Sequence, residues 1–164
     1  MEHLKDILDN QVLFAPIAAW IISQFIKAII NLIVYRKFSF ERLFGDGGMP
    51  SAHSATVMCL CIMIGWTMGF GSPVFALSFI FAVVVMRDAL GVRREAGKQA
   101  ASIKQLAESV NKIFHSKDNE IKTENLKVLV GHTPLQVLFG ALTGAVVAVC
   151  HILIFAIKYS SILL

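Results

Sequence analysis

The sequence predicts an all-α integral membrane protein, a bundle of about four transmembrane helices with a cytoplasmic helical extension. Composition is the first reason: hydrophobic residues make up 56% of the 164-residue chain and charged residues 16%, whereas a soluble domain is about one quarter charged. The second reason is that the apolar residues gather into long runs. We treat residues 1–164 as a single membrane-embedded domain.

The apolar runs place the spans. They cover residues 12–35, 54–70, 73–92 and 134–157. A span needs roughly 17 to 25 residues, so the second is short, and the third reaches full length only by continuing through Arg87 and Asp88. Residues 89–114 predict a helix that continues out of the membrane, and residues 116–123 predict a polar loop.

Basic residues orient these spans. The links 36–48 and 87–131 are rich in lysine and arginine, whereas the link 70–72 has none. Because basic loops stay in the cytoplasm, we expect both basic links inside and both termini outside. The second and fourth spans then begin at the same cytoplasmic face.

The second span is preceded by the first chemical motif, Gly-Gly-Met-Pro-Ser-Ala-His-Ser-Ala over residues 47–55. Ser51 is placed as the N-cap, which puts His53 in the first helical turn. Backbone N–H groups at such a terminus attract anions, and Gly48 lets a ligand approach the backbone. The alternative is an ordinary capped helix whose histidine faces water.

The fourth span is preceded by the second motif, Gly-His-Thr-Pro-Leu-Gln-Val over residues 131–137. Thr133 and Gln136 form a capping box around Pro134, which suits the first helical position. We interpret Gln136 as this cap, and not as a partner of His132, because His132 lies four residues earlier and outside the helix. His132, beside Gly131, is a candidate ligand or nucleophile.

Several cations could complete an anion site. Arg93 and Arg94 offer planar guanidinium donors that suit phosphate. Lys27 lies within the first span, where it either snorkels to the surface or faces inward with Gln24 and Asn31. Asp88 lies at membrane depth, where charges are costly and usually functional. His151 has no such surroundings and receives no role.

The patterns Gly65-x-x-x-Gly69 and Gly140-x-x-x-Gly144 favour close approach of the two motif-bearing helices. If those helices pack together, His53 and His132 come near each other. The three cysteines all fall in apolar runs, so they predict no disulfide framework. No ligand spacing indicates a metal or another cofactor, and nothing predicts a nucleic-acid partner.

Together these residues resemble the type-2 phosphatidic acid phosphatase superfamily, which includes the vanadium-dependent haloperoxidases. The superfamily motif Pro-Ser-Gly-His is similar to residues 50–53, and His-x-x-x-Asp-Val-x-x-Gly is similar to residues 132–140. The closer resemblance is to the divergent bacterial branch related to acid phosphatases and haloperoxidases. Its signatures are similar to residues 47–55, 88–100 and 131–137.

The resemblance implies a role for each motif residue. His132 would be the nucleophile that takes the phosphoryl group, His53 would protonate the leaving oxygen, and Ser51 would hold phosphate oxygens. Three features depart from the superfamily: its Lys-x6-Arg-Pro motif is absent, Lys127 stands where a Ser-Arg pair is expected, and Gln136 replaces an aspartate. We expect cations to compensate, and they are Lys27, Arg93, Arg94 and Lys127.

The predicted function is to bind, and to hydrolyse, a lipid or isoprenoid phosphate or pyrophosphate at the cytoplasmic face of a bacterial cell membrane. Two alternatives stay open. One is a non-catalytic lipid-phosphate transporter or binding protein that keeps the anion pocket, and the departures favour it over a fully active enzyme. The other is a structural membrane protein with a basic face. A homodimer is plausible because four short helices enclose little interior.

Overall fold

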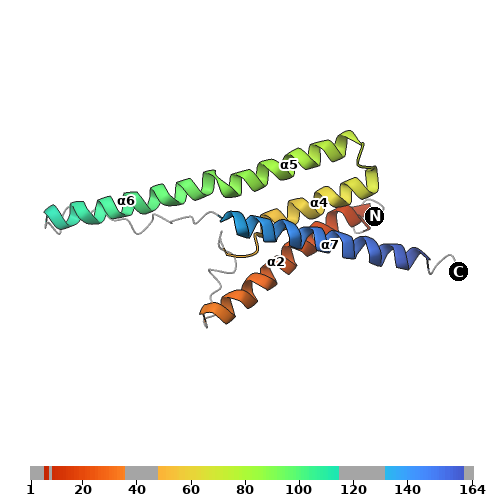
Figure 1. The fold of residues 1–164 in the computed structure, drawn as a ribbon, viewed down its shortest axis with the longest axis horizontal. Helices are drawn as coiled ribbons and strands as arrows, with labels where there is room; N and C mark the ends of the chain where they lie inside the picture. Colours follow the sequence, from red (N-terminus) through yellow and green to blue (C-terminus); the bar gives the residue numbers. More distant parts are fainter. Residues whose placement is uncertain (1–5, 8, 36–47, 115–131, 161–164) are drawn as a thin grey trace.

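The computed structural model describes residues 6–7, 9–35, 48–114 and 132–160, and it is helical throughout its regular elements (Figure 1). Its helices are α2 (Gln11–Tyr35), α4 (Ala52–Met68), α5 (Pro73–Leu90), α6 (Val92–Phe114) and α7 (Pro134–Ser160). Three stretches are long and apolar enough to cross a membrane: Gln11–Val34, Pro73–Asn111 and Pro134–Lys158. The shorter apolar helix α4 completes the bundle. The predicted all-α membrane bundle is therefore confirmed.

Helix α4 is the centre of the bundle. It contacts α2, α5 and α7, and α2 also packs on α7. Figure 1 shows α5 and α6 following one another in a nearly straight line, with α6 reaching beyond the other helices. The helix predicted to leave the membrane is present, but it is divided from α5 at Gly91, whose N–H donates to the Arg87 carbonyl at 2.9 Å.

Small residues let α4, α2 and α7 approach closely. Ala15, Ala19, Cys59, Met63 and Ala148 form one buried cluster where these helices meet. A Cβ at Gly140 would run into the Ser51 carbonyl, and a Cβ at Gly144 into that of Ala55. The second glycine pattern therefore acts as expected, as a contact surface between backbones.

The first glycine pattern serves a different purpose. The space that a Cβ at Gly65 would need is taken by the ring of Phe70, a residue beyond the end of the same helix. Gly69 follows the last helical residue with a φ of 87°, which glycine adopts without strain. Gly65 and Gly69 therefore shape the turn between α4 and α5 and do not form a seam with α7.

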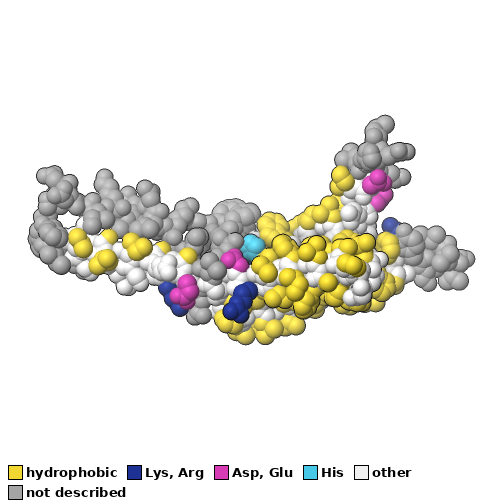
Figure 2. All heavy atoms as spheres, turned by 90° about the horizontal axis from the view of Figure 1, so that it is seen from above, with side chains coloured by type: hydrophobic (Ala, Val, Ile, Leu, Met, Phe, Trp, Pro, Cys, Tyr) yellow, Lys and Arg dark blue, Asp and Glu magenta, His cyan; other side chains and the backbone are white. Residues whose placement is uncertain are grey.

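The outer surface of the bundle is strongly apolar. Hydrophobic side chains cover most of the bundle surface seen in Figure 2. On α5, for example, Leu77 is 71% exposed, and Ile80 and Val84 are more than half exposed. A continuous apolar surface of this kind requires a non-aqueous covering, which a lipid bilayer supplies.

Candidate functional site

The turn before α4 positions the first motif. Gly48 has a φ of 84°, and the Met49–Pro50 peptide bond is cis. Ser51 is the N-cap, as the sequence predicts: its Oγ accepts from the Ser54 N–H at 3.4 Å, and the Ser54 hydroxyl is 3.0 Å from the same oxygen. Ser51 and Ser54 are fully buried. His53 lies in the first turn, where its side chain is exposed.

The start of α7 contains the predicted capping box. The Thr133 N–H donates to Gln136 Oε1 at 3.1 Å, and the Gln136 N–H donates to Thr133 Oγ1 at 3.4 Å. Pro134 is the first helical residue. The local sequence therefore determines this helix terminus completely, because each partner lies within one turn of the other.

The expectation that Gln136 serves only as this cap is wrong. His132 Nδ1 lies 3.2 Å from Gln136 Oε1, the same oxygen that accepts the Thr133 N–H. Because a backbone N–H can only donate, the atom facing it must be the amide oxygen. His132 Nδ1 therefore carries the proton, and in the neutral ring the lone pair is on Nε2. One side chain caps the helix and also sets the histidine tautomer.

Main-chain hydrogen bonds bring the two motifs together at one end of the bundle. The Ser51 N–H donates to the Gln136 carbonyl at 3.0 Å, which ties the start of α4 to the first turn of α7. The His132 N–H donates to the Ala89 carbonyl at 3.1 Å, which ties the second motif to the end of α5. His132 is only 5% exposed. The site is therefore a junction of α4, α5 and α7.

Helix α2 adds a buried lysine to this junction. Lys27 is 3% exposed, so its side chain faces the bundle and does not snorkel. A Cβ at Gly48 would lie 3.4 Å from Lys27 Cγ and 3.5 Å from Cδ. The lysine stem thus runs beside the turn that precedes α4. Ser23 is also buried on α2, and the buried Oε1 of Gln24 has no hydrogen-bond partner among the described residues.

The remaining candidates are less closely placed. Asp88 is half-buried one residue before Ala89, while Arg87 is exposed. Arg93 and Arg94 lie in the first turns of α6, but their side chains are outside the described structure, as are Lys127 and Gly131. Within the described residues, no group of three or more His, Cys, Asp and Glu side chains could hold a metal ion.

Sequence reasoning missed Ser54 and Ala89 as parts of the site. Ser54 follows the motif residue His53 and repeats the hydroxyl of Ser51, which was a usable signal. Ala89 contributes only its backbone carbonyl, and no side-chain pattern marks such a contact. Gly140 was recognised for packing, but its contact with Ser51 also makes it a support of the site.

The junction has the chemistry of an anion site. The N-termini of α4 and α7 each present the positive end of a helix dipole, and Lys27 adds a buried amino group. The contact from Thr133 through Gln136 to His132 supplies an oriented imidazole. Groups of these kinds are the ones that favour an anion over a neutral ligand.

Comparison with known proteins agrees with this geometry. A family model described as the divergent PAP2 family, where PAP2 denotes type-2 phosphatidic acid phosphatase, matches residues 8–147. The uncharacterized membrane protein YuiD of Bacillus subtilis strain 168 is 43% identical over 145 residues, which cover 85% of this chain and 92% of that protein. No solved structure matches the chain. This chain therefore belongs to the divergent PAP2 family of membrane proteins.

Proposed function

We propose that this protein binds a lipid or isoprenoid phosphate or pyrophosphate at the junction of α2, α4, α5 and α7, and that it hydrolyses the phosphoester or phosphoanhydride bond. The single observation that carries this proposal is the contact of His132 Nδ1 with Gln136 Oε1. With the proton on Nδ1, the neutral form of the ring has its lone pair on Nε2, which is the nitrogen we propose as the nucleophile.

In the proposed reaction, His132 Nε2 attacks phosphorus and the bond to the leaving oxygen breaks. His53, exposed beside the junction, donates a proton to that oxygen. Water then attacks the phosphohistidine, gives its proton to His53 and releases inorganic phosphate. The terminus of α4 capped by Ser51, together with Lys27, stabilises charge on the equatorial oxygens. Arg93, Arg94 and Lys127 are proposed as further phosphate ligands.

A second candidate function is binding or transport of the same lipid phosphate without turnover. The burial of His132 and Lys27 favours it, because neither side chain is open to solvent in this conformation. The carboxamide of Gln136 favours it too, since an amide stabilises an imidazolium less than a carboxylate does. Asp88 could supply the missing negative charge from the end of α5.

Phosphate release by the purified protein, reconstituted with a panel of lipid and isoprenoid phosphates and pyrophosphates, separates these two functions. Hydrolysis predicts release that is lost in His132→Ala and slowed in His53→Ala, together with a phosphohistidine on His132 that can be trapped by acid-free quenching of the unmodified protein during turnover. Binding without turnover predicts that the unmodified protein retains the lipid phosphate and releases none. Failure of every compound to bind would reject both functions.

The cellular setting is part of the proposal. The basic links support a junction at the cytoplasmic face of a bacterial cell membrane. The lipid would then present its phosphate from the inner leaflet, with its apolar chain beside the exposed hydrophobic helices.

A further inference from the structure

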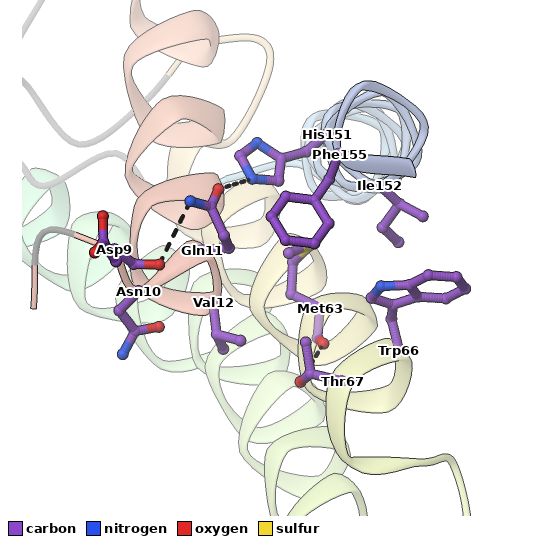
Figure 3. Close-up of a pocket in the computed structure, with 10 residues that line it drawn as sticks. All are labelled: Asp9, Asn10, Gln11, Val12, Met63, Trp66, Thr67, His151, Ile152 and Phe155. Carbon is purple, nitrogen blue, oxygen red and sulfur yellow. Dashed lines mark hydrogen bonds between the residues drawn. The ribbon is translucent and has the colours of Figure 1, made fainter. Parts of the chain in front are cut away.

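A pocket of about 260 Å³ lies at the opposite end of α4 from the His132 junction. It is bounded by the start of α2 with the two residues before it, the last turns of α4 and the C-terminal half of α7 (Figure 3). Along α4, Ser51 and Trp66 are separated by fifteen residues, so the two sites are about 22 Å apart along the helix axis. The pocket is therefore separate from the site described above.

Several polar side chains of this pocket are engaged in internal hydrogen bonds. Gln11 Oε1 lies 2.6 Å from His151 Nε2, and Gln11 Nε2 donates to the Asp9 carbonyl at 3.4 Å. The Thr67 hydroxyl donates to the Met63 carbonyl at 2.8 Å, and Asn10 Oδ1 accepts from the Leu13 N–H at 3.1 Å. Figure 3 shows Asp9, Asn10 and Gln11 together at one edge of the pocket. The carboxylate of Asp9 at this edge disfavours an anionic headgroup.

Away from its polar edge, the wall is apolar and adaptable. Val12, Met63, Trp66, Ile152 and Phe155 line this part, and in Figure 3 Met63 lies among the side chains from α2 and α7. Water against these side chains would lack hydrogen-bond partners, whereas hydrocarbon loses nothing by lying there. A thioether and aromatic rings also adjust readily to an irregular chain.

We infer that this pocket binds one hydrocarbon chain of a membrane lipid at the membrane face where α2 begins and α4 ends. The membrane interface is already established by the apolar spans, and the pocket continues the same lipid-facing surface inward between three helices. The apolar part of the wall favours hydrocarbon, the polar side chains gather at one edge, and lipid chains are the hydrocarbon that surrounds the protein. This inference does not depend on phosphate chemistry at His132.

The test uses the full chain in nanodiscs of phosphatidylcholine that contain a small fraction of phosphatidylcholine with a diazirine on one acyl chain. After illumination, peptide mass spectrometry compares adducts on Met63 and Trp66 with adducts on the open lipid-facing residues Leu77 and Ile80. We expect adducts to be enriched in the pocket. Val12→Trp and Ile152→Trp, which fill it from different helices, should each lower the pocket yield by about tenfold, as excluding two methylene groups predicts.

The matched control is Leu77→Trp, which adds the same side chain to an open face of α5 and should leave the pocket yield unchanged. Thermal unfolding checks that each variant is folded. If one of the two pocket-filling variants does not fold, the other still tests the inference. Equal labelling of pocket and α5, or pocket labelling that survives both filling variants, would overturn the inference. So would a yield about tenfold higher when the probe carries an anionic headgroup on the same chain, because the headgroup would then dominate recognition.

Discussion

Gln136 shows how one side chain can serve a helix terminus and a reactive group together. Its Oε1 accepts from Thr133 and from His132, and both donors lie before the helix begins. The capping box needs only an oxygen at this position, and so does the histidine. A glutamate carboxylate, which has the same length as the glutamine side chain, would offer an oxygen to the same two donors.

We therefore expect Gln136→Glu to keep both the fold and any phosphate release. Gln136→Ala should lower the free energy of unfolding by about 1 kcal/mol through the lost cap, and it should also reduce phosphate release because His132 loses its tautomer. The matched control is Ser72→Ala, which removes another N-cap whose Oγ accepts from the Phe75 N–H at 3.1 Å. Thermal unfolding and phosphate release are measured on all three variants. Ser72→Ala should lose about as much stability as Gln136→Ala but should keep its phosphate release. Unchanged release in a folded Gln136→Ala protein would contradict the orienting role.

Gly48 is required by its conformation. A φ of 84° costs an L-residue about 1–2 kcal/mol, whereas a Cβ there would make only ordinary van der Waals contact with the Lys27 stem. Gly48→Ala should therefore lower the thermal unfolding midpoint through backbone strain. Gly71→Ala is the control, because a Cβ there meets nothing within 4 Å. A Gly48→Ala protein as stable as the Gly71→Ala protein would show that the turn can relax.

Among the elements, the α4–α7 pair holds the site in place. Its glycines bring two backbones into contact, and the same contact permits the Ser51 N–H to reach the Gln136 carbonyl. The close packing of α4 on α7 therefore also fixes the position of the two motifs relative to each other. A change that separates the helices should also break the hydrogen bond that joins the two motifs.

Gly144→Ala should cost about 1–3 kcal/mol, because its Cβ would meet the backbone of Ala55, which cannot turn aside. Gly65→Ala should cost less, because the obstacle there is the 64% exposed ring of Phe70, which can rotate outward at the cost of its edge-on contact with Phe75. Unfolding in detergent, followed by circular dichroism, measures both. If Gly65→Ala were the more damaging variant, the assignment of the α4–α7 seam would be wrong.

At the scale of the whole molecule, the two ends of the bundle differ in chemistry. One end holds Lys27, Ser51 and His132, and the other holds the apolar pocket with Gln11 and His151. The turn between α4 and α5 lies at the pocket end, because α4 begins at Ala52, beside the His132 junction, and ends at Met68. Membrane orientation therefore decides which leaflet each site meets.

We expect the His132 end to face the cytoplasm, from the basic residues in its links. In a Cys150→Ser background, whose other cysteines are buried, a membrane-impermeant maleimide should label Gly71→Cys in intact cells. It should label Lys117→Cys only after permeabilisation. Gly71 is suitable because a side chain there meets no neighbour within 4 Å. The reverse pattern of labelling would place the phosphate site outside and reject the proposed orientation.

The sequence by itself determined the features that depend on neighbours in the chain. Apolar runs predicted the helices, and the caps at Ser51 and Thr133 were predicted because each cap and its partner lie within one turn. The glycine pattern on α7 also predicted its contact with α4. The pattern on α4 did not, because the space beside Gly65 is occupied by the ring of Phe70.

Only the tertiary structure decided the contacts between distant segments. The inward direction of Lys27, the bond from His132 to Ala89 and the pairing of Gln11 with His151 each depend on how helices are rotated about their axes. Periodicity does not determine that rotation when nearly every face of a helix is apolar. In a bilayer, the inner and outer faces carry similar residues, so packing between helices, and not hydrophobicity, selects which side chains meet.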